Sequence, residues 1–477
     1  MKRLKRIFLS IFILIAILFI FILIVIGVDR QRTSYLKIEN IEQAKNNSFL
    51  IINANIIPMT QDTILVKKMV YIQDGVIKSI NDTIEIQGVE VIDAKNKFLT
   101  PGLIDMHVHV WDKYELGLYL SNGVTAVRNL WGRPNHLRLK EQINSGELLS
   151  PLFFTSSPKL TGPEFIGDDN LQLTSTKEAR QKVISYKARG FDFIKTYYGL
   201  TEDLFDAVIE QAQRSDIDIV AHPTPKVPYE AHFNAQIASI EHAEEIIQQP
   251  LNYELDTIKL NKVVEKYVAS PHTSFSPTLT GYYNIYKMLV NDKILSSDQV
   301  KMMNPLIRMV DSKAQYERWS NTKAIDSSIV DLIKNQHEFH LKIIHKLNEN
   351  GVNIICSTDA GIGVTTPGFS IHEELAFYQE AGLSNYEVLK TATVNASRAH
   401  EIMNNMGTVE VDKIANLLLL DDNPLTDLSA LRRPSTIFIN GRKLNRSILD
   451  DFEIKAWNRK NLIASGIRYL EYLIFEK

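Results

Sequence analysis

Between residues 101 and 404 the chain repeats one pattern, a short apolar run ending in polar residues and then a stretch with helical spacing. In residues 201–213, for example, apolar side chains recur three or four positions apart behind acidic residues that suit a helix start. Eight such runs lie at residues 102–110, 123–130, 151–157, 191–198, 216–223, 238–244, 273–280 and 352–360. Alternating strand and helix units of this number predict an α/β fold, a (β/α)8 TIM-like barrel.

The segments that flank the predicted barrel are rich in short strands. Residues 49–100 and 405–445 contain apolar runs joined at Asp74-Gly75 and Asn440-Gly441, dipeptides typical of tight hairpin turns. We expect both segments to meet in one small discontinuous β-sandwich domain beside the barrel at 101–404.

Two further segments are predicted to be helical. Residues from about 283 to 340 separate the last two predicted strands, and they suit a rim or lid element and a thickened barrel wall equally well. Residues 446–477 are predicted to form a C-terminal helix, with one apolar face made by Ile463, Ile467, Leu470 and Ile474. Packing of that face on the body is the favoured interpretation, and contact with a membrane or partner is the alternative.

The amino terminus has the pattern of a membrane anchor. Residues 1–6 are basic, and residues 7–28 are uncharged and apolar. These 22 residues span about 33 Å as a helix, enough for a hydrocarbon core of about 30 Å. We favour an uncleaved signal anchor over a long cleavable signal, with 29–48 as a polar tether. Because basic residues stay in the cytoplasm, the remainder is expected on the periplasmic or extracellular side as a single-pass membrane protein.

Composition narrows the chemistry that the chain can use. Its net charge of -3 argues against a nucleic-acid partner, because phosphate binding needs a basic surface. The single cysteine, Cys356, excludes an internal disulfide and a cysteine-based zinc site, and its apolar strand predicts a core position. Any metal site must therefore use histidine, carboxylate or lysine side chains.

Histidines gather at the predicted strand ends. His107 and His109 are two residues apart, so they point to the same face of a strand, as does Asp105. Alone, this pair fits a divalent metal site or a hydrogen-bonded core pair equally well. Other predicted strands end in His222, His242 and Asp359, and a further strand carries Lys195. A protonated lysine would repel a metal, whereas a neutral amine that has reacted with carbon dioxide is an anionic carbamate able to bridge two metals.

Several segments together resemble those of a known family. They are LTPGLIDMHVH, GVTAVRNL, GFDFIKTYY, IVAHP, SIEHAEE, STDAG, GFSIHEELAFYQEAGLSNYEVLKTATVNAS and GTVEVDKIANLLLLDDNPL. This set is similar to the amidohydrolase superfamily, in particular to its imidazolonepropionase-like and Xaa-Pro dipeptidase-like branch. The similarity extends from about residue 49 to residue 445.

The resemblance implies a two-metal centre. His107, His109 and Asp359 would bind a first ion, His222 and His242 a second, and the carbamate of Lys195 would bridge them. A shared hydroxide would attack the substrate carbonyl, and catalytic Asp359 would pass its proton to the leaving amine. The two divalent ions are expected to be zinc, although these ligands also accept manganese, iron or cobalt.

Two departures from the family pattern concern substrate contacts. Arg128-Asn129 stands where relatives often have Arg-Asp, and KLTGPEF at 159–165 replaces an element that often carries histidine. Tyr197 is a candidate substrate-binding residue, with wall packing as the alternative. Arg128 is a candidate clamp for a substrate carboxylate, with a structural ion pair as the favoured alternative.

The remaining histidines are expected to lie outside the site. His272 is placed in a loop and His372 in a structural position. Solvated positions on helices or in the insert are predicted for His136, His232, His337, His340, His345 and His400.

The predicted function is a membrane-anchored, metal-dependent hydrolase of amide or peptide bonds, acting on a small molecule or short peptide. Cyclic-amide hydrolysis, as in imidazolonepropionase-like proteins, is the alternative within this class. Two further alternatives are hydrolysis of a lactone or phosphoester and a barrel that binds metal without catalysis. A homo-oligomer is compatible with the sequence, which leaves the oligomeric state open.

Overall fold

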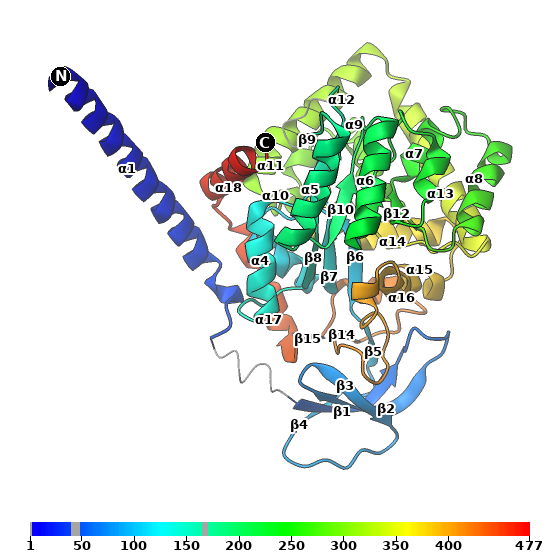
Figure 1. Ribbon diagram of the computed structural model, residues 1–477. Helices are drawn as coiled ribbons and strands as arrows, with labels where there is room; N and C mark the ends of the chain where they lie inside the picture. Colours follow the sequence, from blue (N-terminus) through cyan, green and yellow to red (C-terminus); the bar gives the residue numbers. More distant parts are fainter. Residues whose placement is uncertain (1, 40–47, 165–169) are drawn as a thin grey trace.

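The computed structural model describes residues 2–39, 48–164 and 170–477, and Figure 1 shows a barrel, a smaller β-rich part below it and a projecting helix. The projecting helix is α1 (Lys2–Arg32), which contains the predicted span. Within Arg3–Arg32 an 18-residue window has a mean hydropathy of 3.6, and the helix is long and apolar enough to cross a membrane. α1 points away from the body for most of its length.

The predicted tether at 29–48 differs from the structure in its first part. α1 continues to Arg32, and the short helix η1 (Ser34–Leu36) follows it. Leu36 is fully buried, and its carbonyl accepts a hydrogen bond from the Leu149 amide. Residues 29–39 are therefore packed against the body, while the rest of the predicted tether up to residue 47 lies outside the described residues.

The barrel is built from parallel strands in chain order. They are β6 (Leu103–Val108), β7 (Val124–Asn129), β8 (Leu152–Thr161), β10 (Phe193–Thr196), β11 (Ile219–Ala221), β12 (Ile237–Glu241) and β13 (Ser274–Ser276), with β9 (Asn170–Gln172) paired to β8. The eighth predicted segment closes the ring through two single bridges, Phe275 to Ile354 and Val108 to Ala360. The Met106 amide also donates to the Cys356 carbonyl. The predicted TIM-like barrel is thus confirmed, as a nearly closed parallel barrel whose last strand is irregular.

Helices cover the outside of the barrel (Figure 1). They are α3 (Lys113–Ser121), α4 (Pro134–Asn144), α5 (Thr176–Arg189), α6 (Glu202–Ser215), α7 (Ala243–Gln248), α8 (Thr257–Ala269), α14 (Ser370–Glu380), α15 (Asn385–Thr391) and α16 (Val394–Arg398). In α6 the predicted apolar face is buried, including Leu204, Phe205 and Val208. Burial of such faces against the strands is the main stabilising contribution to this kind of barrel.

The terminal strand segments share one sheet. It contains β1 (Ser48–Ile56), β2 (Leu65–Gln73), β3 (Val76–Asn81), β4 (Glu90–Asp93), β5 (Phe98–Pro101), β14 (Leu417–Leu420), β15 (Thr436–Ile439) and β16 (Arg442–Asn445). β5 and β14 pair antiparallel and join the two segments, which are more than 300 residues apart in sequence. Asp74, Gly75, Asn440 and Gly441 all have positive φ, as the predicted hairpin turns require.

The helical insert follows β13. In this insert, residues Lys313–Ile325 lie above the barrel (Figure 1), whereas residues Ile329–Glu349 pack on the side of the barrel against α7, α8 and α14. Its elements are α9 (Leu279–Val290), η3 (Ile294–Ser296), α10 (Asp298–Lys301), α11 (Pro305–Ile307), the π-helical turn η4 (Arg308–Ser312), α12 (Lys313–Ile325) and α13 (Ile329–Glu349).

The C-terminal region differs from the predicted single helix. It forms α17 (Arg446–Trp457) and α18 (Leu462–Phe475), separated by a short break. The predicted apolar face of α18 does not pack on the body, because Ile463, Leu470 and Ile474 are exposed. The opposite face is the buried one, with Ala464 and Tyr472 against the body.

Candidate metal centre

The six predicted metal ligands converge at one end of the barrel. Each of them lies at or just beyond the carboxyl end of a strand, where barrel active sites are found. His107 is in β6 and Lys195 in β10, while His109, His222, His242 and Asp359 follow their strand segments. All six line the same cavity of about 620 Å³.

His107, His109 and Asp359 form the most compact group. Asp359 Oδ1 lies 2.8 Å from His109 Nε2 and 3.3 Å from His107 Nε2. One ligand atom from each residue falls within 4.8 Å of the others, a geometry that could hold a metal ion. Asp359 has a φ of 56°, a left-handed conformation that is strained for aspartate and frequent at functional sites.

His222 and His242 extend the group on the other side of His107. The His242 ring centroid lies 4.6 Å from that of His222 and 4.9 Å from that of His107. His242 also has a positive φ, 74°, and its Nδ1 is 2.8 Å from Thr278 Oγ1. His222 Nε2 lies 3.1 Å from Glu245 Oε1. The histidines thus form a continuous line across the cavity floor.

Lys195 lies among these histidines with its side chain almost completely buried. It is 1 % exposed, and its Nζ has no hydrogen-bond partner within the described chain. Burial lowers the pKa of Lys195 from 10.5 to about 8, against the attraction of Glu241. A buried amine without a partner is costly, so this position suits a lysine whose charge is removed or reversed.

The donors present fit divalent cations. Within the described residues His109 Nδ1 and His222 Nδ1, like Lys195 Nζ, are buried and unpartnered. Burial lowers the pKa of His107 to about 4, so its imidazole is neutral, which is the ligand form. Imidazole and carboxylate donors at this spacing are the set that zinc and similar ions accept. The chain therefore offers two groups of candidate ligands near Lys195, one with His107, His109 and Asp359 and the other with His222 and His242.

His107 contacts a buried ion pair formed by Glu241 and Arg128. Glu241 Oε2 lies 2.7 Å from His107 Nδ1, and Glu241 Oε1 accepts from Arg128 Nη2 at 2.9 Å. Arg128 also donates to the Met106 carbonyl and contacts His400. Arg128 is fully buried and does not line the cavity. The structure therefore does not place Arg128 where it could act as the predicted clamp for a substrate carboxylate. Arg128 belongs to the structural ion pair that was the favoured alternative.

The cavity wall combines aromatic side chains with a second lysine. Tyr197 lines it, beside the His222 ring at 4.7 Å between centroids. Lys159, the first residue of the unusual KLTGPEF segment, pairs with Lys195 across β8 and β10. Its Nζ lies 4.9 Å from the centre of the Trp131 ring and 4.6 Å from that of Tyr197. Further lining residues come from the insert and the C-terminal helix, namely Leu306, Ile307, Val310, Asp311, Gln315 and Tyr469.

The prediction that the six remaining helix and insert histidines are solvated is wrong for most of them. Five of those six are buried, namely His136, His232, His337, His340 and His400. Their rings pack among aromatic and polar neighbours, as His337 does against Phe377 at 4.5 Å between centroids. His345 is half exposed. His272 is exposed and His372 is buried against the Asn122 carbonyl.

Several residues of the site were not identified from the sequence. Glu241 directly precedes His242 in SIEHAE, so its position in the motif was a usable signal. Lys159 falls in a segment noted only for lacking a histidine. Trp111, Trp131 and Tyr469 carry no local signal, because they reach the cavity through tertiary packing.

Known proteins similar to this chain share its architecture. The model of the Amidohydrolase family matches residues 98–444. A 5-methylthioadenosine/S-adenosylhomocysteine deaminase of Pyrococcus furiosus is 22% identical over 464 residues, which cover 88% of this chain and 100% of that protein. The solved structure of a bottromycin amidohydrolase has a TM-score of 0.70 at 21% identity, covering 92% of this chain and 96% of that one. A Xaa-Pro dipeptidase with bound methionine has a TM-score of 0.65 at 18% identity, covering 84% and 100%.

Proposed function

Because this chain belongs to the amidohydrolase family, we propose that it hydrolyses a carbon–nitrogen bond of small peptides at a carbamate-bridged pair of divalent metal ions. The observation that carries the proposal is the position of Lys195, which is buried near both groups of histidines and has no hydrogen-bond partner at Nζ among the described residues. A structural lysine in a barrel core would be expected to have an ion-pair partner at Nζ.

The ligands divide into two sets around Lys195. His107, His109 and Asp359 would hold one ion, and His222 and His242 the other, with the Lys195 carbamate shared between them. When bound, the pair supplies an activated water at neutral pH and polarises the substrate carbonyl. Zinc is the expected ion, and manganese, iron and cobalt suit the same ligands.

Asp359 is positioned to handle the proton. Burial alone would raise its pKa, but the adjacent His107 and His109 hold the pKa below its usual range, so its carboxylate is ionised. One carboxylate oxygen can accept the proton of the attacking water and deliver it to the nitrogen of the leaving amine. Glu241, held by Arg128, keeps His107 in the tautomer that leaves Nε2 for coordination.

The cavity wall supports a substrate with a free carboxylate. Lys159 brings an ammonium group to the wall, between the rings of Trp131 and Tyr197. A peptide carboxylate paired with Lys159 would place its amide bond toward the metal ligands, because Lys159 and Lys195 are adjacent across two strands. Tyr197 would contact the substrate from the same wall. The dipeptidase among the similar structures supports this substrate class.

We further propose that α1 anchors the enzyme in a membrane, with the barrel on the periplasmic or extracellular side. The length and hydropathy of Arg3–Arg32 support an anchor, and the basic residues before it support a cytoplasmic amino terminus.

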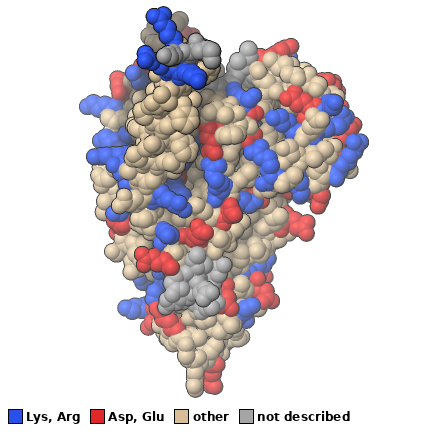
Figure 2. Space-filling view, turned by 60° about the vertical axis from the view of Figure 1, so that its left-hand side comes forward, with Lys and Arg blue, Asp and Glu red and all other residues tan. Residues whose placement is uncertain are grey.

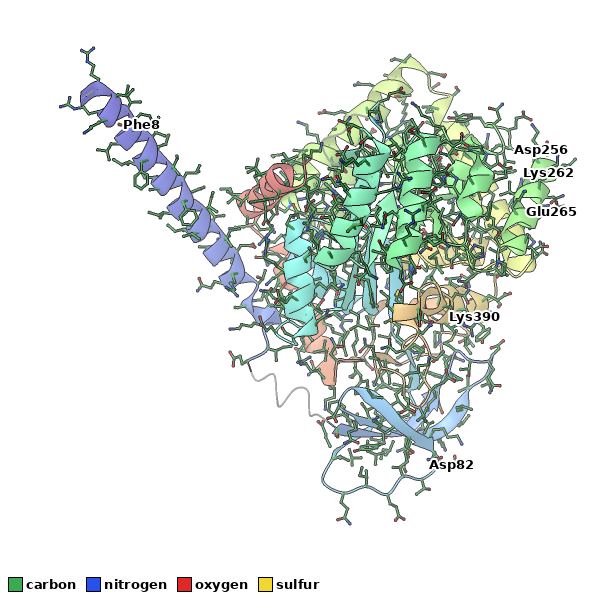
Figure 3. All side chains as sticks on the ribbon, in the orientation of Figure 1. Phe8, Asp82, Asp256, Lys262, Glu265 and Lys390 are labelled. Atoms are coloured by element: carbon green, nitrogen blue, oxygen red, sulfur yellow. The ribbon has the colours of Figure 1, made fainter. Side chains whose placement is uncertain are left out.

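The test is the metal content of the full-length protein, purified with zinc and bicarbonate, beside Lys195→Ala and a control, Lys390→Ala on the exterior (Figure 3). Two ions per chain are expected for the unchanged protein and the control, and one or none for Lys195→Ala. A dipeptide library then defines the substrate. One ion in all three forms would remove Lys195 from the site and point to single-metal chemistry such as deamination.

A further inference from the structure

The C-terminal helix α18 carries an apolar stripe that nothing in the described chain covers. Ile463, Leu470, Ile474 and Phe475 are exposed, the last two at 72% each. Residues 463, 470 and 474 lie on one side of the helix, since they are seven and four positions apart. Exposed contiguous apolar surface of this kind marks a contact with a partner or a membrane.

Two polar contacts join α18 and the residue shortly before it to the base of the membrane helix. Arg468 forms an ion pair with Asp29, and Arg32 Nη1 donates to the Lys460 carbonyl at 2.7 Å. Asp29 directly follows the apolar residues 7–28, so it marks the level at which α1 leaves the hydrocarbon. α18 is consequently held at the level of the lipid headgroups, and Figure 1 shows it on the same side of the barrel as α1.

The helix that carries the stripe also reaches the mouth of the cavity. Met309 and Val310, in η4, are exposed apolar residues, and Val310 also lines the cavity. α11, which leads directly into η4, contacts α18, and Tyr469 of α18 also lines the cavity. The rim of the active site is therefore in contact with α18, the helix that carries the apolar stripe on its outer face.

Charge around the base of α1 suits anionic headgroups. Arg30, Arg32 and Lys37 are exposed there, next to the end of the apolar helix. Figure 2, which brings this side forward, shows α1 as a largely uncharged column with lysine and arginine at its free end. Cations at this level and an apolar stripe beside them are the combination that interfacial helices use.

From these contacts we infer that the α18 stripe and η4 rest on the bilayer surface, so that the cavity of the enzyme opens beside the lipid headgroups. This inference depends on the proposed anchoring by α1. Interfacial helices bury their apolar face about 5–10 Å into the headgroup boundary. Such a contact adds a second point of attachment between the barrel and the membrane, beside α1.

The experiment measures lipid contact at single labelled positions of the full-length protein in vesicles of phosphatidylcholine and phosphatidylglycerol. Phe8→Cys, Ile474→Cys and Ile258→Cys each receive an environment-sensitive fluorophore, since the native Cys356 is buried and stays unlabelled. Phe8 projects from the free part of α1 (Figure 3) and reports anchoring, while Ile258 is an equally exposed isoleucine on α8 and serves as the matched control. Quenching by nitroxide-labelled lipids is compared with quenching by aqueous iodide.

Lipid quenching at position 474 should exceed that at 258 by about threefold or more, with iodide quenching reduced in proportion. Quenching at position 8 without quenching at 474 would overturn the inference and leave the anchor intact. Protection of position 474 from both quenchers would also overturn it, in favour of a second copy of the chain on α18. Absence of lipid quenching at both position 8 and position 474 would refute the proposed anchoring by α1. Zinc-dependent hydrolysis, measured in the same vesicles, tests the proposed reaction independently of the anchoring.

Discussion

Glu241 lies 2.7 Å from Nδ1 of His107 and thereby turns the other ring nitrogen toward Asp359. Both side chains are almost completely buried, and the pair connects the cavity floor to Arg128 deeper in the barrel. A carboxylate behind a metal-binding histidine fixes the tautomer and makes the ligand more basic.

Replacement of this carboxylate should weaken metal binding. In Glu241→Gln the amide accepts less strongly from His107, so zinc affinity should fall about 10- to 100-fold. Titration of the metal-free protein with zinc, followed by calorimetry, measures the change. Glu210→Gln, on the exposed side of α6, is the matched control and should bind as the unchanged protein does. Equal affinity in both variants would mean that Glu241 only neutralises Arg128.

Carbamate formation at Lys195 should depend on pH. Because burial lowers the pKa of this amine to about 8, the protonated form prevails below that pH and cannot react, whereas the neutral form prevails above it. Metal-free protein in ¹³C-bicarbonate should therefore gain a carbamate carbon signal between pH 7 and 9. Lys195→Arg should show no such signal, and a signal of unchanged size in that variant would assign the reaction to another amine.

Lys159 should determine the preference for a free carboxylate. Lys159→Met keeps an unbranched side chain of nearly the same length and removes its charge, so KM for a dipeptide should rise about 10- to 100-fold as a charged hydrogen bond is lost. The matched substrate is the same dipeptide with an amidated carboxyl end, for which both enzymes should have similar KM values. An equal loss on both substrates would indicate a structural role in the Trp131–Tyr197 wall.

Glu374 should make folding stability depend on pH. Burial raises its pKa to about 7, although Leu279 and Thr280 donate to it. Between about pH 4.5 and 7 the unfolded chain ionises this group while the folded chain keeps it protonated, so its contribution to stability falls as pH rises.

The comparison is between the unchanged protein and Glu374→Gln in urea unfolding at pH 5 and pH 8. The free energy of unfolding should decrease over this range by roughly 1–3 kcal/mol more in the unchanged protein, because glutamine does not ionise. Glu373→Gln, at the partly exposed neighbour on α14 that pairs with Lys287, should keep the pH dependence due to Glu374. A parallel decrease in all three proteins would show that other groups cause it.

Much of the candidate metal centre was predictable because it follows from strand geometry. His107 and His109 share a face by the two-residue repeat of a strand, and parallel strands bring their carboxyl ends to one edge of a barrel. This brought together His222, His242, Lys195 and Asp359 without any knowledge of their distances. The hairpins at Asp74-Gly75 and Asn440-Gly441 were equally local, since each turn depends on the conformation of two residues.

Tertiary structure decided which faces are covered and which groups meet across the fold. The apolar pattern of α18 predicts an amphipathic helix, but only packing determines that Ala464 and Tyr472 are buried and Ile474 is exposed. The insert and α18 reach the cavity through contacts between segments far apart in the chain, and the same is true of the pairing of Arg128 with Glu241. The sequence by itself determined the candidate ligands and the barrel, because these depend on local periodicity. The cavity wall and the exposed stripe depend on long-range packing, which no local pattern encodes.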